Sequence, residues 1–286
     1  MAADQGVTAE SGRRRNRLTL ALLLVPPMAW LVVAYLGSLA VLLVSALWST
    51  NSFTGAVVHT VTGDNVVRVL TDEVFRTVTI RTVGVALLVT VICAVLAVPL
   101  GLYMAKVASP RTRLALVVAV TTPLWASYLV KAYAWRVMLS PEGPMSWAVG
   151  YTPGYGLVAT VVTLTYLWLP YMIIPVFAAF DRVPNHLVDA SSDLGASDFS
   201  TLRMVLAPLA FPGIAAGSIF TFSLSLGDYI AVTIVGGKTQ MLGNIIYGQL
   251  VTANDQPLAA ALSVIPLVAV ILYLLAMRRT GALENV

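Results

Sequence analysis

Residues 187–208 read LVDASSDLGASDFSTLRMVLAP, a polar segment in a chain that is otherwise strongly apolar. Of the 286 residues, 58% are hydrophobic and only 10% are charged, and the mean hydropathy is +0.86. A soluble domain needs far more charge to cover its wet surface, so this composition indicates an integral membrane protein. The segment therefore interrupts a series of membrane spans, and its place among them has to be established first.

Six blocks of sequence carry no charged residue over membrane length. Each is near or above the roughly 20 residues that cross about 30 Å of hydrocarbon, where a helix satisfies its own backbone. The blocks are 18–48, 82–105, 114–130, 156–180, 204–227 and 256–277. The sequence thus predicts an all-α membrane protein with six transmembrane helices. Residues 239–254 are uncharged but rich in amides, so we interpret them as an interfacial or re-entrant piece rather than a seventh span.

The distribution of Lys and Arg predicts the orientation. Eleven of these residues fall on the side that holds the N-terminus and six on the other side. The positive-inside rule therefore predicts a multi-pass protein of the cell membrane, with a basic cytoplasmic tail at 1–17 and a second cytoplasmic tail at 279–286. The same rule places the polar segment in the cytoplasm, between the fourth and fifth spans. Topology accounts for the net charge of +4, and no aromatic-basic patch suggests nucleic acid as a partner.

Enzymatic and metal-binding functions find little support in the sequence. His59 and His186 fall on opposite sides of the membrane, and neither has a Cys or carboxylate at ligand spacing. Gly237-Lys238-Thr239 resembles the end of a phosphate-binding loop, but Val232 stands where that pattern requires glycine. We therefore expect no catalytic residue, no metal, no cofactor and no nucleotide site in this chain.

The polar segment predicts two short helices joined by a glycine. Pro184 suits the first turn of a helix, and Gly195 can adopt the left-handed conformation that ends one. Ser197 or Asp198 can cap a second helix that continues into the fifth span. The residues at i, i+3, i+4 and i+7 form one mildly apolar face of the first helix: Leu187, Ala190, Ser191 and Leu194.

The charges of the first helix are unusual for a simple connector. Asp189 and Asp193 are like charges at i and i+4, which weakens an isolated helix by a few tenths of a kcal/mol. Asp193 also lies at the negative end of the helix dipole. A cationic partner would remove both penalties, whereas a solvated loop with some helical turns remains an alternative on these residues alone.

The spacing of the segment resembles that of permease subunits of binding-protein-dependent ABC importers. Their cytoplasmic loop has the pattern E-A-A, three residues, G, nine residues, I-x-L-P. The matching positions here are Asp189-Ala190-Ser191, Gly195, Val205, Ala207 and Pro208. Every spacing is kept, with Asp, Ser, Val and Ala in place of Glu, Ala, Ile and Leu.

This resemblance implies the type I ABC importer permease fold over residues 18–278, with the loop at 181–204 as its coupling helix. In that family the coupling helix docks on a cytoplasmic ABC ATPase dimer, which hydrolyses the ATP. Asp189, Ala190, Ser191, Gly195 and Pro208 are then the candidates for coupling to the ATPase. An external substrate-binding protein and a second permease subunit, similar or identical, are the other implied partners.

Two further segments resemble the spermidine/putrescine permease subfamily. Residues 123–135 read PLWASYLVKAYAW and are followed by Gly143. Residues 226–230 read LGDYI and are followed by Gly236-Gly237 and by MLGN at 241–244. The resemblance implies that the chain takes up polyamines.

The same segments supply residues suited to a cation path. Asp228 ends the fifth block, where an ionisable residue beside hydrocarbon is costly and often functional. Aromatic faces attract an ammonium group by about 0.5 to 2 kcal/mol each. The aromatic candidates are Trp125, Tyr128, Tyr133, Trp135 and Tyr229.

Alternatives remain open at this point. The aromatic residues can form an interfacial belt, with Asp228 paired to Lys131 or Arg136. The chain can also be an ABC permease for another small solute, or an ion-coupled secondary transporter in which Asp228 binds the coupling ion. An intramembrane enzyme is a more distant alternative.

Overall fold

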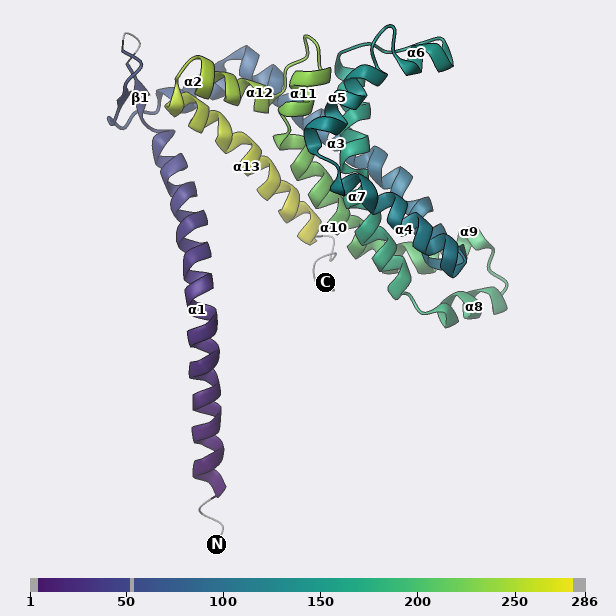
Figure 1. Cartoon of the computed structure of the whole chain (residues 1–286). Coiled ribbons are helices and arrows are strands. Elements are labelled where there is room, and N and C mark those ends of the chain that lie inside the picture. The colour runs from purple at the N-terminus through teal and green to yellow at the C-terminus, as the bar shows by residue number, and fades with distance from the viewer. Residues whose placement is uncertain (1–4, 52–53, 280–286) are drawn as a thin grey trace.

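A computed structural model describes residues 5–51 and 54–279, with side chains from residue 22 onward. Most of the described chain is helical (Figure 1). A two-stranded hairpin that the sequence did not predict, β1 Ser49–Thr50 and β2 Val57–Val58, follows the first helix. The helices are α1 Gln5–Ser45, α2 Asp64–Thr71, α3 Glu73–Leu102, α4 Pro110–Trp125, α5 Tyr128–Met138, α6 Pro144–Val149, α7 Leu157–Arg182, α8 Asn185–Asp193, α9 Asp198–Thr201, α10 Ala207–Gly227, α11 Ile230–Val235, α12 Leu242–Tyr247 and α13 Gln256–Arg279. Three π-helical turns in the described residues extend neighbouring helices: η1 Tyr103–Val107, η2 Leu202–Leu206 and η3 Gly248–Thr252.

Five segments of the described chain are long and apolar enough to cross a membrane. They are Leu22–Ser45, Glu73–Val107, Leu157–Arg182, Asp198–Gly227 and Gln256–Arg279, which match five of the six predicted blocks. Together α4 and α5 pass the same test as a pair, and counting this bent pair as one span gives six. The short helices within 239–254 are not among the spans, as predicted.

The third block differs from its prediction as one continuous helix at 114–130. It is broken between α4 and α5, which meet at an angle of 98°. Ala126 and Ser127 have extended backbone ψ angles of 143° and 137°, so neither continues the helix. At the break the Pro123 carbonyl accepts two hydrogen bonds, one from the Ala126 N–H at 3.3 Å and one from the Lys131 ammonium at 3.0 Å.

The core of the fold is the packing of α3, α7 and α10 against one another. Two glycines four residues apart in α10 form a small-xxx-small pair, which allows two helices to approach closely. A Cβ atom at Gly213 would lie 2.3 Å from Cβ of Ala179, and one at Gly217 would lie 2.6 Å from Sδ of Met172. Both contacts are to α7, so the glycines set the separation of these two helices.

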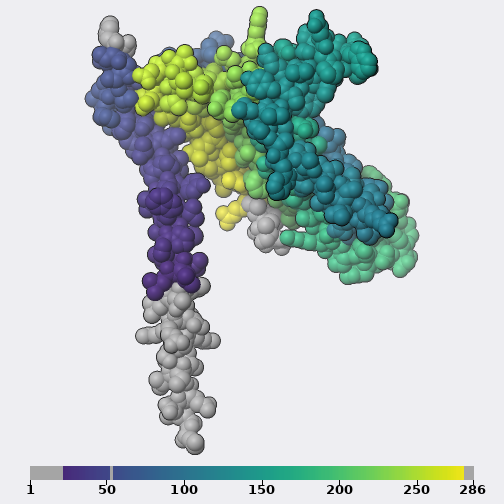
Figure 2. All heavy atoms as spheres, viewed as in Figure 1, coloured from purple at the N-terminus to yellow at the C-terminus, as the bar shows by residue number. Residues whose placement is uncertain are grey.

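The first helix stands apart from this core, as Figure 2 shows for the part of α1 that is coloured. None of the most apolar stretch of Leu22–Ser45 is buried against the rest of the chain. The far end of α1 joins a smaller cluster in which Ala46 packs with residues of α2, α3, α12 and α13. This span therefore offers nearly all of its surface to lipid or to another protein.

The connecting segments gather at two ends of the molecule. In Figure 1, α2, α6, α11 and α12 lie at one end, and α8 and α9 lie at the other. The start of α1 points toward the end that holds α8. The assignment of that end to the cytoplasm stays a prediction from the charges. The predicted tails run into residues 1–4 and 280–286, which lie outside the described residues, as do the side chains of the arginine cluster at 13–17.

Candidate functional site

The polar segment forms a helix, a glycine turn and a second helix. Pro184 precedes α8, and Gly195 follows its end with φ of +78°, so the predicted left-handed turn is confirmed. The Gly195 N–H donates to the Ser192 carbonyl at 2.9 Å, and the Ala196 N–H donates to the Ser191 carbonyl at 3.1 Å. These two bonds form a Schellman motif, which satisfies carbonyls at the helix end. We call residues 184–203 the elbow.

The second half of the elbow starts as the sequence predicts. The Ser197 hydroxyl accepts a hydrogen bond from the Ser200 N–H at 3.3 Å and so caps α9. The hydroxyls of Ser191 and Thr201 lie 2.8 Å apart and tie the two helices together. From α9 the chain passes through η2 into α10, where Pro208 lies in the first turn. The elbow is therefore a defined turn joined directly to a membrane span.

The outer surface of the elbow combines acidic and apolar side chains. Asp189, Ala190 and Gly195 are exposed, and Ser191 is half-buried. Leu194, which was predicted to lie on the mildly apolar face of the first helix, is the C-cap residue of α8 and is 89% exposed. Phe199, in the first turn of α9, is 70% exposed. Exposed apolar side chains beside carboxylates are typical of a surface that binds another protein.

A second candidate site lies at the opposite end, where α10 stops. Asp228 follows the last residue of α10 and is only 7% exposed. It borders a cavity of about 320 Å³. The lining residues come from the start of α5, the middle of α7 and the junction between α10 and α11: Tyr128, Trp168, Ser223, Leu224, Gly227, Asp228, Tyr229 and Ile230. We call this cavity the acidic pocket.

Two neutral donors hold the Asp228 carboxylate. The Tyr128 hydroxyl donates to Oδ2, and the Ala231 N–H donates to Oδ1 at 2.9 Å. The Ala231 N–H also lies 3.2 Å from the Tyr128 hydroxyl oxygen. Asp228 lies one residue outside the apolar span, and its burial raises the pKa of the carboxyl, while the bond from Tyr128 acts in the opposite direction. A cation in the pocket would favour the ionised carboxylate.

The alternative pairing of Asp228 with Lys131 or Arg136 is not formed. Lys131 donates to the Pro123 carbonyl instead. Arg136 donates to the Ile234 carbonyl, and its guanidinium lies 4.9 Å from the centre of the Tyr155 ring. Among the residues that the structure describes, Asp228 forms no salt bridge. The acidic pocket thus contains a buried carboxyl without a cationic partner.

The aromatic candidates divide into two groups. Tyr128 and Tyr229 border the acidic pocket with Asp228. Trp125, Tyr133 and Trp135 do not border it: Trp125 is 90% exposed at the end of α4, Tyr133 is exposed, and Trp135 packs on Tyr166 with ring centres 5.4 Å apart. These three residues fit an interfacial belt better than a cation path.

Sequence reasoning missed two aromatic residues beside the pocket. Trp168 stacks on Tyr128 with ring centres 5.9 Å apart, and Tyr247 stacks on Tyr229 at 5.0 Å. Trp168 falls in an apolar span and Tyr247 in a helix far along the chain, so neither belongs to the segments that suggested the site. No signal in the sequence singles out Trp168, because the same span also contains Tyr166, Tyr171, Phe177 and Phe180.

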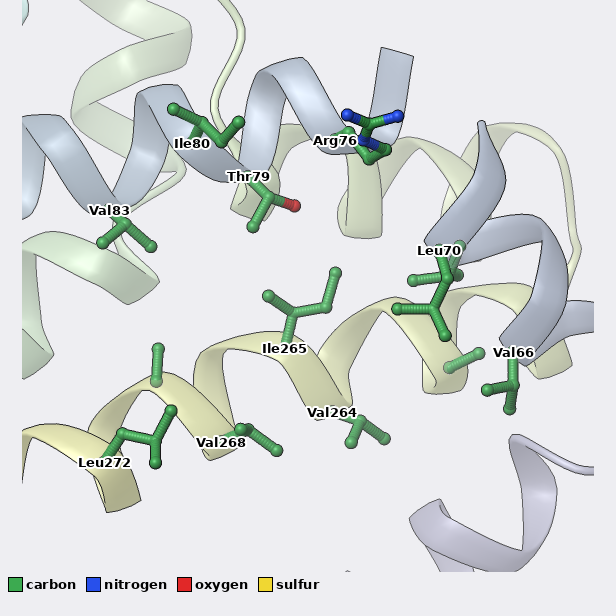
Figure 3. Close-up of a pocket in the computed structure, with 13 residues that line it drawn as sticks. Val66, Leu70, Arg76, Thr79, Ile80, Val83, Val264, Ile265, Val268 and Leu272 are labelled. Atoms are coloured by element: carbon green, nitrogen blue, oxygen red, sulfur yellow. The ribbon is translucent and has the colours of Figure 1, made fainter. Parts of the chain in front are cut away.

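A hollow larger than the acidic pocket is a different feature, an apolar groove between α2, α3 and α13. Its volume is about 620 Å³, and Figure 3 shows its wall of aliphatic side chains, with Arg76 and Thr79 as the labelled polar residues. The polar groups that orient a solute do not converge there. A surface of this kind suits lipid chains or another apolar helix.

The arrangement of elements defines a class of protein. The described chain has five continuous spans and one bent pair, and three of these spans pack against one another as the core through α3, α7 and α10. A glycine elbow with exposed acidic and apolar side chains joins the fourth span to the fifth. This is the architecture of a helical multi-span membrane protein with a structured turn exposed at one end. Comparisons with known proteins then identify the family.

Residues 97–280 match the family described as binding-protein-dependent transport system inner membrane component. The inner membrane ABC transporter permease protein YdcU of Escherichia coli K12 is 39% identical over 93% of this chain and 91% of its own length. The spermidine/putrescine transport system permease protein PotB of the same organism is 28% identical over 92% of this chain and 98% of its own length. The chain therefore belongs to the family of binding-protein-dependent transport system inner membrane components.

Solved structures confirm the fold at lower sequence identity. A bacterial ABC transporter involved in the import of the acidic polysaccharide alginate superposes with a TM-score of 0.70 at 18% identity, over 95% of this chain and 99% of the matched chain. The MetNI methionine ABC transporter superposes with a TM-score of 0.55 at 23% identity, over 73% of this chain and 97% of that one. The protein is a multi-pass membrane permease subunit of an ABC importer, with the predicted type I fold.

Proposed function

We propose that this permease imports polyamines such as putrescine and spermidine, and that the acidic pocket forms part of their path. The supporting observation is Asp228, a buried carboxyl with only neutral hydrogen-bond donors. Burying an unpaired charge is unfavourable. A passing ammonium group would interact favourably with the Asp228 carboxylate and would reduce the free-energy cost of burying it. The relationship to PotB over 92% of the chain points to the same class of substrate.

The neighbouring rings suit a cation that must also leave. Tyr128, Trp168 and Tyr229 line the pocket, and an aromatic ring can attract an ammonium group by about 0.5 to 2 kcal/mol. One carboxylate and several rings give moderate attraction at each step, whereas a cluster of carboxylates would trap a polycation. When one ammonium group of a polyamine lies in the pocket, the other amines of the same molecule are solvated elsewhere along the path.

The elbow is the proposed contact with the ATPase. Exposed Leu194 and Phe199 supply apolar surface, and Asp189 supplies negative charge for basic groups of the partner. Gly195 allows the tight turn that passes movement of α8 to α9 and α10. ATP hydrolysis then takes place on the separate ATPase dimer, on the cytoplasmic side that holds both termini.

Two more partners complete the proposed importer. An external binding protein delivers the substrate to the end of the molecule that holds the acidic pocket. A second permease subunit faces this one, and the exposed α1 span provides surface on which it can pack. An ABC permease for another solute is the main alternative, because the alginate and methionine importers share the fold alone.

Uptake by Asp228→Asn in membrane vesicles tests the proposal. Asparagine keeps an acceptor for the Ala231 N–H and removes the charge. We expect polyamine uptake to fall about tenfold or more, the effect of about 1.4 kcal/mol, at unchanged expression. Asp64→Asn is the matched control, since Asp64 is an exposed acid in the first turn of α2 at the same end of the molecule. Equal uptake by both variants and the wild type removes Asp228 from the path.

A further inference from the structure

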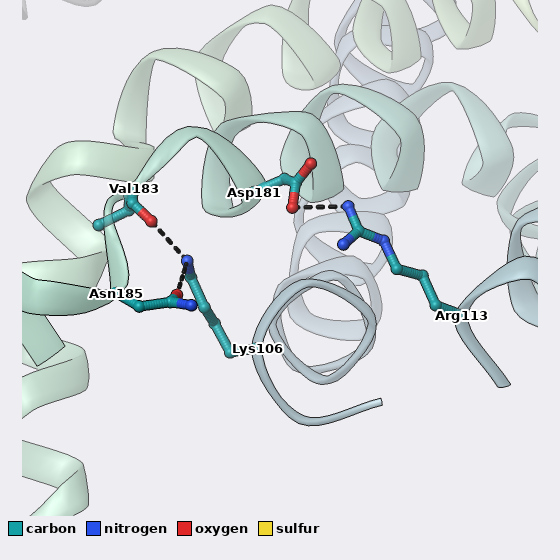
Figure 4. Close-up of polar contacts among 5 residues, drawn as sticks. All are labelled: Lys106, Arg113, Asp181, Val183 and Asn185. Atoms are coloured by element: carbon teal, nitrogen blue, oxygen red, sulfur yellow. Dashed lines mark hydrogen bonds and ion pairs between the residues drawn. The ribbon is translucent and has the colours of Figure 1, made fainter. Parts of the chain in front are cut away.

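A set of polar contacts surrounds the end of α7, where the chain turns into α8 (Figure 4). Lys106 of η1 donates from Nζ to the Val183 carbonyl at 2.5 Å and to Oδ1 of Asn185 at 3.0 Å. Val183 is the residue after α7, and Asn185 is the first residue of α8. One ammonium group from the second span thus bonds both sides of the junction between α7 and the elbow.

The Val183 carbonyl needs a donor because of its position. It belongs to the terminus of α7, where the last carbonyls have no partner inside the helix. Val183 is 5% exposed, so water is largely excluded from its side chain and the junction is packed. A cation also interacts favourably with the negative end of a helix dipole. Lys106 therefore satisfies the helix end with a charge-assisted bond rather than an ordinary one.

The π-helical turn η1 places Lys106 at this junction. The Ala108 N–H bonds to the Tyr103 carbonyl at 2.8 Å, five residues back, so the turn holds one residue more than an α-helical turn. On the same turn Met104 is buried in the core formed with α7. Such turns occur often at functional sites, and this one anchors Lys106 to the packed part of α3.

A second polar contact nearby is weaker. Arg113 of α4 forms an ion pair with Asp181 of α7 at 2.6 Å, and its guanidinium lies 4.9 Å from the centre of the Phe177 ring. Both charged side chains are substantially exposed, at 35% and 42%, and such pairs contribute little because solvent and salt screen them. This pair also stops short of the elbow, since neither residue belongs to it. Lys106 alone of these cations bonds to an elbow residue.

We propose that Lys106 is a positioning residue that fixes the angle of α8 to the second span, so that movement imposed on the elbow by the ATPase is passed to α3 as well as to α7 and α10. The proposal rests on the coupling role proposed for the elbow. Covalently, the elbow is joined only to α7 through Val183-Pro184 and to α10 through η2. The Lys106 contacts add the third link, to the remaining helix of the core.

The matched substitutions are Lys106→Gln and Arg111→Gln. Arg111 lies in the first turn of α4, is exposed, and has no hydrogen bond or ion pair among the described residues. Both variants remove one positive charge from the same connection between α3 and α4, but only the first removes contacts with the elbow. Lys106→Arg keeps a charged donor, and Asn185→Ala removes one acceptor while leaving Lys106 in place.

The first measurement is hydrogen exchange of residues 185–194 in the intact complex held in lipid nanodiscs. Loss of a charge-assisted bond raises the population of the open junction, and we expect about tenfold faster exchange in Lys106→Gln. Arg111→Gln should match the wild type, Asn185→Ala should show a smaller increase, and Lys106→Arg should restore protection. Equal exchange in Lys106→Gln and Arg111→Gln overturns the proposal. If Lys106→Gln does not assemble, wild-type exchange in Asn185→Ala overturns it instead.

The second measurement is substrate taken up per ATP hydrolysed in proteoliposomes, which a purely structural role would leave unchanged. We expect this ratio to fall about fivefold or more in Lys106→Gln, to recover in Lys106→Arg, and to stay at the wild-type value in Arg111→Gln. Gly195→Val separates the two hypotheses. If Gly195→Val lowers the uptake per ATP hydrolysed while Lys106→Gln does not, only the Lys106 proposal fails. If Gly195→Val keeps normal coupling, the coupling role of the elbow fails, and the exchange result still decides whether Lys106 holds α8.

Discussion

Replacing Gly195 by valine should uncouple ATP hydrolysis from uptake without preventing insertion in the membrane. Gly195 has φ of +78°, and no heavy atom lies within 4 Å of the place where a Cβ would stand. The cost of the substitution is therefore conformational rather than steric. A residue with a Cβ pays roughly 1–2 kcal/mol in the left-handed region, and a β-branched residue is among the least tolerant. This free energy changes the population of the native elbow by about 5- to 30-fold.

The assay is uptake and ATP hydrolysis by the purified complex in proteoliposomes. Gly195→Asn should retain most coupling, because asparagine enters the left-handed region more readily than valine. Gly150→Val is the matched control: Gly150 also ends a helix, with φ of +73°, and a Cβ there meets nothing within 4 Å. Gly150 ends α6, at the end of the molecule away from the elbow. If both valine variants lower uptake per ATP equally, the elbow has no special role and the reasoning is refuted.

Three further outcomes follow from the packing and the surfaces. Gly213→Ala should destabilise the purified chain by about 1–3 kcal/mol in thermal unfolding, because the new methyl overlaps Ala179. Gly84→Ala, with open space around its Cβ, should be neutral or stabilising by up to about 1 kcal/mol. A Gly84→Ala variant that is less stable than Gly213→Ala would contradict the packing described. A cysteine at Ser192 should react more slowly with a water-soluble maleimide when the ATPase is bound, and equal rates argue against docking at the elbow. Leu194→Ser should weaken retention of the ATPase on size-exclusion chromatography while leaving thermal stability unchanged, since Leu194 is 89% exposed.

Local signals in the sequence predicted much of the fold. Blocks without charge identified the spans, and the glycine after a short helix predicted the left-handed turn at Gly195. The break between α4 and α5 escaped prediction because Ala126 and Ser127 are compatible with a helix, and the bond from Lys131 to the Pro123 carbonyl across the bend is visible only in the structure. A hydropathy pattern records which residues suit lipid and contains no information on such contacts.

The candidate sites were predicted less completely, for a related reason. Asp228 was recognised because an acid at the end of a span is costly, but its partners depend on how distant helices meet. Tyr128 lies 100 residues away and Trp168 on yet another helix, and only the fold brings them together. Leu194 was recognised as part of one mildly apolar face of the first helix, but its exposure of 89% at the Schellman turn could not be read from that pattern.

The most direct test of the central claim is uptake of labelled putrescine by proteoliposomes that contain this chain with its ATPase, partner permease and binding protein. We predict uptake that requires ATP hydrolysis, saturates, and is competed by spermidine but not by methionine or alginate oligosaccharide. An ion gradient without ATP should not drive it. ATP-dependent uptake of another solute with no response to polyamines would contradict the substrate assignment. Gradient-driven uptake without ATP would contradict the account as a whole.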